Sequence, residues 1–444
     1  MADSLIRDRR PHVVVVGGGF GGLSAVRKLR RADLDVTLID RHTYNQFQPL
    51  LYQVATGTLN PGDITWFLRT VRSHQKNVRF LKGVVRRMDH ATKTLYLDGG
   101  PAVAYDYLVI AAGVTTNYFG VPGAEEHAMP LYKRSQALDV RDKMFAQLEE
   151  AAINGQHQDL RIVVVGGGAT GVETAGAFAE LRNNDMPVTY PELDPKRTHV
   201  SLVEMMPSLL GPFHENLQEY AKKSLEKRSV DLRLNTAVKE VRPDGVVVGD
   251  DEEFLPAGLV VWASGVTAHD TVQDWGVPQG RGGRITVDDH LRVKGLDGVF
   301  AIGDIAVEDG DRALPQLAQP ALQGGKFVGK LIKAETTGKT RKAFRYRDKG
   351  TMATIGRSSA VAQVTGLPRL KGFPAWVIWV VIHVYSLLGN RNRLATVINL
   401  GAKYLFWRRS HNAIVGETPP IVMRKPKKLG AGEQPVDERR PYGD

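Results

Sequence analysis

Two segments of the sequence, residues 17–22 and 166–171, carry glycines at the spacing Gly-x-Gly-x-x-Gly, and each follows a run of valines and isoleucines. In this pattern the first glycine permits a tight turn, the second lets the backbone approach a pyrophosphate, and the third lets a helix pack on a strand. The positive end of that helix then faces the phosphates. One copy is weak evidence, but two copies about 149 residues apart, each between a strand pattern and a helix pattern, predict two dinucleotide-binding units. The glycines are Gly17, Gly19 and Gly22 in the first copy and Gly166, Gly168 and Gly171 in the second.

An acidic residue follows each glycine pattern at the end of the next predicted strand, Asp40 in the first half and Glu204 in the second. A carboxylate at this position accepts hydrogen bonds from the ribose hydroxyls of a nucleotide. It also repels the 2′-phosphate of NADP, so Glu204 favours NADH; the alternative is a solvated glutamate at a strand end. Glu204 lies later than usual because residues 183–197, rich in Pro, Asn and Asp, are expected to form an inserted loop.

Two further predicted strands, at 105–113 and 260–265, end in small residues, and a third, at 298–304, ends in Gly-Asp. Small residues at the carboxyl end of a strand let a ligand lie against the backbone, which is the usual ligand position in open parallel sheets. The alternation of strand and helix patterns predicts an α/β fold with two Rossmann-like dinucleotide-binding domains and a further carboxyl-terminal region.

The 444-residue chain contains no cysteine. This excludes disulfide frameworks, thiolate zinc or iron–sulfur sites and any cysteine redox relay. The sequence shows no other metal-ligand pattern, so we expect no metal. Residues 1–10 are charged and lack an apolar stretch, unlike a signal peptide, so we expect the bulk of the chain to stay in the cytoplasm.

The net charge of +11 is concentrated near the carboxyl end, where residues 369–428 hold eleven Lys and Arg and a single acidic residue, Glu417. A basic surface attracts anionic lipid or nucleic acid. The residues between these charges are aliphatic rather than polar, so we expect an anionic bilayer surface as partner and no nucleic acid.

Two apolar segments lie within this basic region. Residues 372–390 contain no Asp, Glu, Lys or Arg, and Pro374 and Gly389 delimit a predicted helix of about 14 residues, short of the ~20 needed to span a bilayer. Residues 394–407 form one apolar helical face between arginines, which is typical of a helix in the headgroup plane. Interfacial docking is favoured; a dry domain or dimer core and a transmembrane span are the alternatives. The face comprises Leu394, Val397, Ile398, Tyr404 and Leu405.

Over residues 11–335 the sequence resembles the flavoproteins with two dinucleotide-binding domains, which hold FAD in one Rossmann unit and NAD(P)H in the other. The resemblance implies that Asp40 binds the adenosine half of FAD, that the backbone of Val85 holds its adenine, and that Asp304 contacts its ribityl–pyrophosphate portion. The implied FAD-binding residues are Gly17, Gly19, Phe20, Gly21, Gly22, Asp40, Arg41, Gln48, Val85, Ala112, Gly113, Asp304, Ala318, Gln319 and Lys349. The implied NADH-binding residues are Gly166, Gly168, Gly171, Glu173, Glu204, Ser264 and Gly265.

The lack of cysteine and two sequence motifs narrow the resemblance to one branch of these flavoproteins. Branches that need cysteine beside the flavin, the disulfide reductases and the sulfide:quinone oxidoreductases, are excluded. Residues 318–323 (Ala-Gln-Pro-Ala-Leu-Gln) and 46–57 resemble motifs of the type II NADH:quinone oxidoreductases, single-subunit respiratory dehydrogenases that do not pump protons. Gln319 and Gln323 share a helix face, and each amide can donate to a quinone carbonyl and accept from a quinol hydroxyl. The alternative is a pair of amides that bridge backbone groups in a domain interface.

The resemblance implies that NADH passes a hydride to FAD and that two electrons continue to a membrane quinone, either menaquinone or ubiquinone. It places Glu173 near the nicotinamide and the flavin, and Lys349 near the flavin. From the residues alone, the alternatives are a Glu173 stabilised by the helix N-terminus and a solvated Lys349 in a turn. We predict catalytic roles for Glu173, Gln319 and Gln323.

We expect a FAD-binding domain at 1–115 and 266–345, an NADH-binding domain at 116–265, a membrane-associating region at 346–423 and a disordered tail at 424–444. The enzyme is expected at the cytoplasmic face of the cell membrane, as a peripheral protein and, by resemblance only, as a homodimer. Two alternatives remain. An NADH-dependent reductase of a ferredoxin-like protein would lack the apolar carboxyl-terminal helices, and a flavin-binding scaffold protein would use NADH only to shift a dimer equilibrium.

Overall fold

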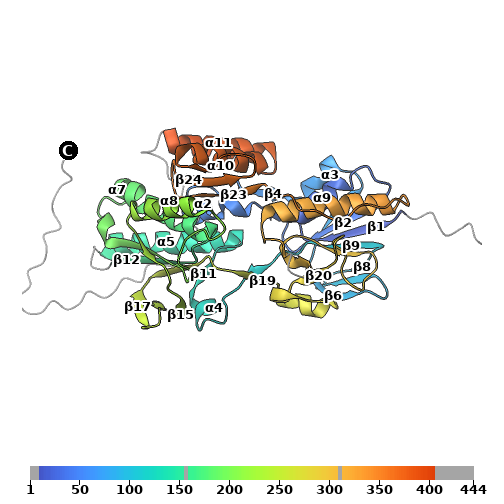
Figure 1. Ribbon diagram of the computed structural model, residues 1–444, viewed down its shortest axis with the longest axis horizontal. Coiled ribbons are helices and arrows are strands. Elements are labelled where there is room, and N and C mark those ends of the chain that lie inside the picture. Colours follow the sequence, from blue (N-terminus) through green and yellow to red (C-terminus); the bar gives the residue numbers. More distant parts are fainter. Residues whose placement is uncertain (1–9, 155–158, 309–312, 406–444) are drawn as a thin grey trace, which may run out of the picture.

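The computed structural model describes residues 10–154, 159–308 and 313–405, except for the side chains of 403–405. Two five-stranded parallel sheets lie side by side along the long axis of the molecule, and two carboxyl-terminal helices cover one side of the region where they meet (Figure 1). The α/β architecture with two Rossmann-like units is the one predicted. The predicted tail 424–444 lies outside the described residues.

The first sheet has the strand order β21-β9-β1-β2-β5, and all its pairings are parallel. The valine-rich central strand β1 is buried along its whole length, as expected of a strand in a parallel sheet covered on both faces. The first glycine loop follows β1 at the carboxyl edge of this sheet, and Asp40 ends the neighbouring strand. The elements are β1 (His12–Val16), α1 (Phe20–Lys28), β2 (Asp35–Asp40), α3 (Val71–His74), β5 (Val78–Lys82), β9 (Tyr107–Ile110), β21 (Val299–Ala301) and α9 (Ala318–Glu335).

The second sheet repeats this design with the order β11-β18-β12-β13-β14, again with all pairings parallel. The strand before the glycine loop is central, the strand before Glu204 lies on one side of it, and a strand ending in small residues lies on the other. The elements are β11 (Met129–Pro130), α5 (Arg134–Asn154), β12 (Leu160–Val165), α6 (Ala169–Glu180), β13 (Thr198–Val203), α8 (Glu215–Glu226), β14 (Val230–Arg233) and β18 (Leu259–Trp262).

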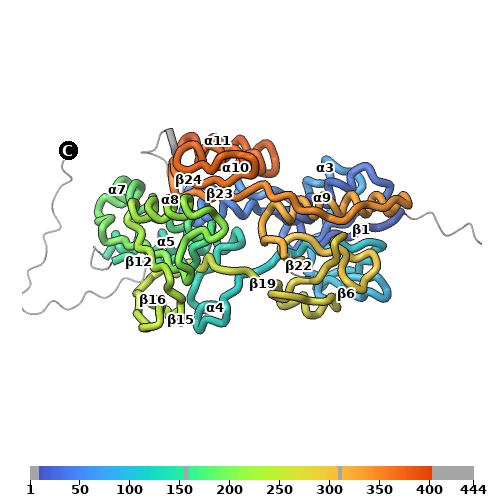
Figure 2. Tube along the Cα trace, viewed as in Figure 1, coloured from blue at the N-terminus to red at the C-terminus, as the bar shows by residue number. Residues whose placement is uncertain are grey.

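The chain crosses from the first unit to the second through β10 (Thr115–Thr116) and returns through β19 (Val266–Thr267), which pair with each other in an antiparallel manner (Figure 2). These crossings fall where we expected the FAD-binding and NADH-binding domains to divide, and we propose the boundaries there. Smaller elements complete the two units. They are α2 (Leu51–Ala55), β3 (Tyr44–Gln46), β4 (Thr65–Phe67), β6 (Val85–Asp89), β7 (Thr94–Leu97), β8 (Ala102–Ala104), α4 (Ala124–His127), β15 (Val238–Arg242), β16 (Gly245–Val248), β17 (Glu253–Pro256), β20 (Ile285–Val287) and β22 (Ala306–Glu308).

The carboxyl-terminal region is a small antiparallel sheet followed by two helices. The sheet comprises β23 (Gly350–Thr354), β24 (Ala360–Val364) and β25 (Leu370–Lys371). It contacts α6 and α8 of the second unit and also α10 (Phe373–Ser386), which is followed by α11 (Asn390–Leu405). Helix α10 has the predicted length of 14 residues. Among the residues that the structure describes, no helix is both long and apolar enough to cross a bilayer.

One local prediction was wrong over part of its range, residues 183–189. Residues 183–197 were expected to be a loop, but the chain after α6 continues through a π-helical turn (Leu181–Asp185) into the short helix α7 (Met186–Thr189). The guanidinium of Arg182 explains the difference. It is buried and donates to the backbone carbonyls of Thr198, Arg228 and Ser229, which ties this segment to the second sheet.

Candidate active site

The first glycine loop leaves no room for side chains at two of its three glycines. A Cβ on Gly17 would lie 2.1 Å from the carbonyl oxygen of Ala111, and Gly17 has a φ of +107°. A Cβ on Gly22 would lie 1.9 Å from the carbonyl oxygen of Gly17, whereas one on Gly19 would meet no protein atom within 4 Å. The loop therefore has the close turn and the open middle position that a pyrophosphate needs.

Asp40 fixes this loop from the neighbouring strand. Its Oδ2 accepts from the backbone N of Gly18 at 2.6 Å, and its Oδ1 accepts from the backbone N of His42 at 2.7 Å. Burial raises the pKa of Asp40, and these two backbone donors oppose that effect. The carbonyl of Asp40 also accepts from the N of Gly83 at 2.9 Å, which brings the segment before Val85 beside the predicted nucleoside position.

The second glycine loop has the same construction. A Cβ on Gly171 would lie 1.7 Å from the carbonyl oxygen of Gly166, and one on Gly168 would meet no protein atom within 4 Å. Glu204 takes the place of Asp40, since its carboxylate accepts from the backbone N atoms of Gly167 and Met206. The two halves thus hold their loops by the same acid-to-backbone contact.

Asp304 lies in a turn (Gly303–Ile305) directly after β21, at the carboxyl edge of the first sheet. Burial raises the pKa of its carboxyl to about 6, although the hydroxyl of Tyr132 and the charge of Arg284 work in the opposite direction. The hydroxyl of Tyr132 donates to Oδ2 at 3.5 Å, a long hydrogen bond. A carboxyl at this sheet edge, with one long hydrogen bond, is suited to accept hydrogen bonds from a ligand hydroxyl.

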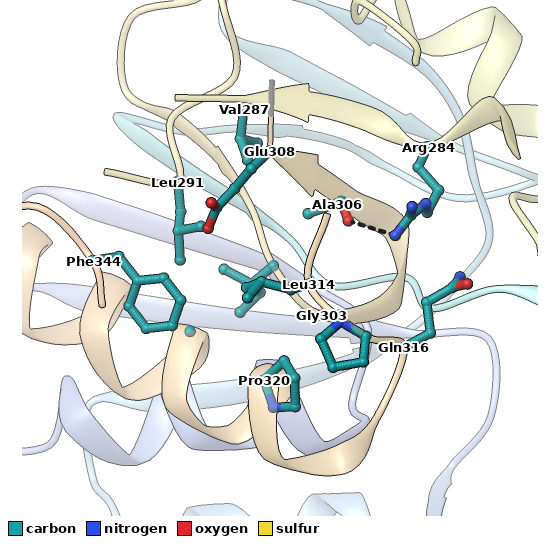
Figure 3. A pocket seen from close by; sticks show the side chains of 13 residues that line it. Arg284, Val287, Leu291, Gly303, Ala306, Glu308, Leu314, Gln316, Pro320 and Phe344 are labelled. Carbon is teal, nitrogen blue, oxygen red and sulfur yellow. Dashed lines mark hydrogen bonds between the residues drawn. The ribbon is translucent and has the colours of Figure 1, made fainter. Parts of the chain in front are cut away.

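A small cavity lies behind this turn, between α9 and the paired strands β20 and β22 (Figure 3). Its volume of about 20 Å³ suffices for one water molecule but not for a cofactor. Arg284 at its rim donates to the carbonyl oxygen of Ala306 at 3.3 Å (Figure 3). The cavity is therefore part of the packing that supports Asp304 rather than a ligand site.

Glu173, in the first turns of α6, is the most deeply enclosed carboxyl of the site, with 7% of its surface exposed. Its Oε1 accepts from the backbone N of Thr354 on β23 at 3.2 Å. The hydroxyl of Thr354 lies 2.9 Å from that of Tyr52 on α2, which in turn accepts from the amide of Gln53 at 2.9 Å. Burial raises the pKa of Glu173 to about 8, so the carboxyl holds a proton at neutral pH.

The two predicted glutamines of α9 have different surroundings. The amide of Gln323 donates to the carbonyl of Arg347 at 2.9 Å, and its oxygen accepts from the N of Arg347 at 3.1 Å. Gln323 therefore bridges backbone groups, the alternative considered for the pair. Its amide lies 3.5 Å from the oxygen of Gln319. Lys349 is exposed and directly precedes β23.

A row of aromatic rings joins the first glycine loop to α10. The ring centroids of Phe20 and Phe47 are 5.7 Å apart, and those of Phe47 and His383 are 6.1 Å apart. His383 stacks on Trp379 at 4.0 Å, and Trp379 lies 6.3 Å from Tyr52. We assigned no role to His383 from the sequence, and here it is an enclosed ring whose pKa burial lowers to about 4.

The remaining predicted residues lie around the two loops. Gln48 begins a short 3-10 turn (Gln48–Leu50) before α2, and the guanidinium of Arg41 lies 2.7 Å from the ring of His269. The carbonyl of Ser264 accepts from the indole of Trp262 at 2.9 Å. Of the others, two begin α1, one begins α9 and three follow strands, among which Gly113 and Gly265 have φ values of +69° and +66°. These others are Phe20, Gly21, Ala112, Gly113, Gly265 and Ala318.

One group of residues could supply metal ligands among the described residues, Asp288, Asp289 and His290. Oδ1 of Asp288 already accepts from the backbone N atoms of His290 and Arg292, and Asp289 pairs with the ring of His290 at 2.6 Å. This cluster has internal partners and lies outside the two glycine loops.

The geometry fits FAD in the first unit, because three features occur at one sheet edge: a glycine loop in which side chains at Gly17 and Gly22 would collide with the backbone, an acid on the adjacent strand, and the half-buried Asp304. The fold and this site define a flavoprotein with two dinucleotide-binding domains. Family models agree. Residues 11–325 match the pyridine nucleotide-disulphide oxidoreductase family, and residues 349–409 match the NDH2 C-terminal domain.

Curated relatives identify the family. The chain is 36% identical to the type II NADH:quinone oxidoreductase Ndh of Mycobacterium tuberculosis, over 92% of this chain and 91% of the relative. It is 37% identical to NdhA of the same organism, over 92% and 90%. The type II NADH:quinone oxidoreductase of Staphylococcus haemolyticus is 31% identical, over 80% and 90%. The chain belongs to the type II NADH:quinone oxidoreductases.

Solved structures support the fold. NDH2 from Plasmodium falciparum, in complex with NADH, has a TM-score of 0.83 at 22% identity, covering 91% of this chain and all of that one. The sulfide:quinone oxidoreductase of Aquifex aeolicus has a TM-score of 0.71 at 20% identity, covering 90% and 96%.

Sequence reasoning missed four residues of the site: Tyr132 beside Asp304, Thr354 and Trp379 beside Glu173, and Arg347 beside Gln323. Each lies far along the chain from its partner, and no motif or spacing marks it. A long-range contact of this kind becomes visible only in the folded protein.

Proposed function

We propose that this NADH:quinone oxidoreductase carries out both half-reactions around Glu173, where α6, β23, α2 and α10 meet. FAD, when bound, supplies the redox chemistry, taking a hydride from NADH and returning two electrons to quinone. The observation that carries the proposal is the buried, protonated Glu173 carboxyl at the start of the NADH-binding helix, held by Thr354 of the carboxyl-terminal sheet.

The residues have distinct roles in this scheme. The first glycine loop, Asp40 and Asp304 hold FAD, and the second glycine loop with Glu204 holds NADH. The carboxylate of Glu204 accepts from two backbone N–H groups, and an acidic residue at this strand end disfavours a 2′-phosphate. The space beside Gly19 and Gly168 in the two loops is open for the pyrophosphates.

Glu173 supplies a proton. The overall reaction converts NADH, one proton and quinone into NAD⁺ and quinol. The hydride of NADH accounts for two electrons and one of the two quinol protons, so the second proton must come from the protein or from water. A carboxyl with a pKa near 8 carries that proton at neutral pH and can release it within the enclosed site.

In this proposal the side chain of Gln319 contacts the quinone. Both polar atoms of the Gln323 amide are engaged by the backbone of Arg347, so Gln323 positions its neighbour on the same helix face. Within the part of the chain that the structure describes, Gln319 has a hydrogen bond only with Gln323, from whose amide it accepts, and its own amide N–H groups are left for a quinone carbonyl.

Helices α10 and α11 dock the enzyme on an anionic bilayer in this proposal. They expose large apolar side chains that no other described element covers, and they follow Arg369 and Lys371 and carry Arg391 and Arg393. Apolar insertion together with basic side chains suits the interface of a membrane, which is where quinone resides. The exposed side chains are Phe373, Val377, Val381, Ile382 and Tyr385 of α10 and Leu394, Val397 and Ile398 of α11.

A ferredoxin-type reductase was expected to lack this helix pair, and the pair is present. The cytoplasmic face, the homodimer and the choice between menaquinone and ubiquinone stay predictions. Stopped-flow absorbance tests the whole proposal. NADH should bleach the flavin, and a short-chain quinone should restore it without oxygen. A purified protein that binds no FAD would refute the scheme.

A further inference from the structure

The indole of Trp379, on α10, is buried beside Glu173 although the two residues are far apart in the sequence. Its side chain is 1% exposed and lies between the rings of Tyr52 and His383. Its Nε1 atom is buried, and no atom of the described residues completes a hydrogen bond with it. A buried N–H without an acceptor is costly, so an acceptor is expected in some state of the site.

The carboxyl of Glu173 can supply this acceptor. One of its oxygens accepts from the N of Thr354, and a carboxylate has capacity for further donors. The indole of Trp379 lies close enough to lower the pKa of this carboxyl, against the stronger opposing effect of burial. A donor acts in that direction because it favours the charged form.

We propose that Trp379 is a positioning residue of the reaction, whose indole N–H holds the Glu173 carboxylate after it has given up its proton. This rests on the proposed function of Glu173. When the O–H bond of Glu173 breaks and its proton passes to a quinone oxygen, a negative charge remains in an apolar site. The N–H of Trp379 then completes its hydrogen bond, and a proton from water later restores the neutral carboxyl.

Helix α10 therefore has two functional faces, one exposed and one directed toward Glu173. It presents Val381 and Tyr385 to the outside, 60% and 76% exposed, and Trp379 to the inside. The helix proposed to dock on the bilayer therefore also controls how readily the catalytic carboxyl ionises.

Other groups around Glu173 leave this assignment unchanged. None of the causes that shift its pKa is a charged side chain of the described residues. The titratable groups that contact its neighbours are Tyr52 from α2, at Thr354, and His383 from α10, at Trp379. His383 is neutral at neutral pH, because burial lowers its pKa to about 4, although its Nδ1, 2.7 Å from the carbonyl oxygen of Trp379, acts in the opposite direction.

Trp379→Phe tests the proposal, since it keeps an aromatic ring and removes the N–H. Infrared titration of the FAD-loaded protein reads the protonated carboxyl directly, and subtraction of the Glu173→Gln spectrum assigns the band. Wild-type Glu173 should titrate near pH 8, and Trp379→Phe should move this upward by about one pH unit. Trp376→Phe, on the same helix, should leave it in place. An unchanged titration in Trp379→Phe overturns the proposal.

The pH dependence of quinone reduction separates the two claims. If Glu173→Gln leaves this dependence unchanged, the proton role of Glu173 is wrong. If Glu173→Gln abolishes it while Trp379→Phe has no effect on the titration, only the role of Trp379 fails. Should Trp379→Phe not fold, benzothienylalanine at position 379 has the same shape with sulfur in place of N–H. The same upward shift is then expected, and its absence contradicts the proposal.

Discussion

Replacement of Glu173 by glutamine should stabilise the protein increasingly as the pH rises. In the unfolded chain the pKa of a glutamate is near 4.5, whereas burial raises that of Glu173 to about 8. Below about pH 4.5 both states carry the proton, and the glutamate has no ionisation cost. Between these values the unfolded chain releases the proton and the folded chain keeps it, so stability falls by about 1.4 kcal/mol for each pH unit. Glutamine does not ionise and escapes this loss.

The difference between a pKa of 4.5 in the unfolded chain and about 8 in the folded protein corresponds to a loss of about 5 kcal/mol in the free energy of unfolding. This value is an upper limit, because a buried carboxyl also relaxes and gains water. We expect about half of this, roughly 2–3 kcal/mol, to develop between pH 5 and pH 8. The side-chain volume is nearly unchanged, and the amide oxygen of glutamine can still accept from the N of Thr354. The pH-dependent part of the difference therefore reports ionisation rather than packing.

Thermal unfolding of both proteins, at equal FAD occupancy and at several pH values from 5 to 8, measures this difference. The melting temperature of Glu173→Gln should rise relative to the wild type as the pH increases. Glu125→Gln, a substitution of an exposed glutamate on α4, serves as the control and should show no such trend. A Glu173→Gln difference that stays constant with pH would refute the buried, protonated carboxyl.

Gly22→Ala should disrupt the first glycine loop, because its Cβ would lie 1.9 Å from the carbonyl oxygen of Gly17, whereas Gly19→Ala should keep the fold and lose FAD. Thermal unfolding of the apoproteins and flavin absorbance per chain distinguish these outcomes. Equal melting temperatures for the two variants would contradict the predicted collision at Gly22. Gln319→Leu should slow flavin reoxidation by quinone about tenfold, the loss of one hydrogen bond, with flavin reduction by NADH nearly unchanged. Equal loss in both half-reactions would count against quinone contact. Val381→Asp should weaken binding to anionic vesicles, and Phe254→Asp, at an exposed apolar residue of β17, should not. If both variants sediment like the wild type, α10 is not the docking surface.

Local patterns were sufficient to predict much of the fold. The valine runs before each glycine loop became the central strands β1 and β12, and Asp40 and Glu204 follow the neighbouring strands as expected. These features depend on residues within about 40 positions of one another, so periodicity and turn chemistry specify them. The apolar stretch after Gly372 likewise became a 14-residue helix.

Contacts between distant segments were beyond such patterns. The sequence could not show that Gln323 bonds the backbone of Arg347, or that a threonine of the carboxyl-terminal sheet would hold Glu173. The π-helical turn after α6 was missed for a related reason. Residues with loop-like composition are held in helical form there by Arg182, whose acceptors lie up to 47 residues away.

The matched construction of the two glycine loops bears on how long each nucleotide stays. In both loops a side chain at the first or third glycine would collide with the backbone, and in both an acidic side chain accepts a hydrogen bond from the loop. The loops themselves therefore give no reason for one nucleotide to remain bound and the other to leave. The helices behind them differ. On the first side α9 is pressed against α1, where a Cβ on Gly325 would lie 2.1 Å from the carbonyl oxygen of Gly21. The difference in residence time between the two nucleotides is thus a property of the elements that enclose each loop, and we expect it to depend on the contact between α9 and α1.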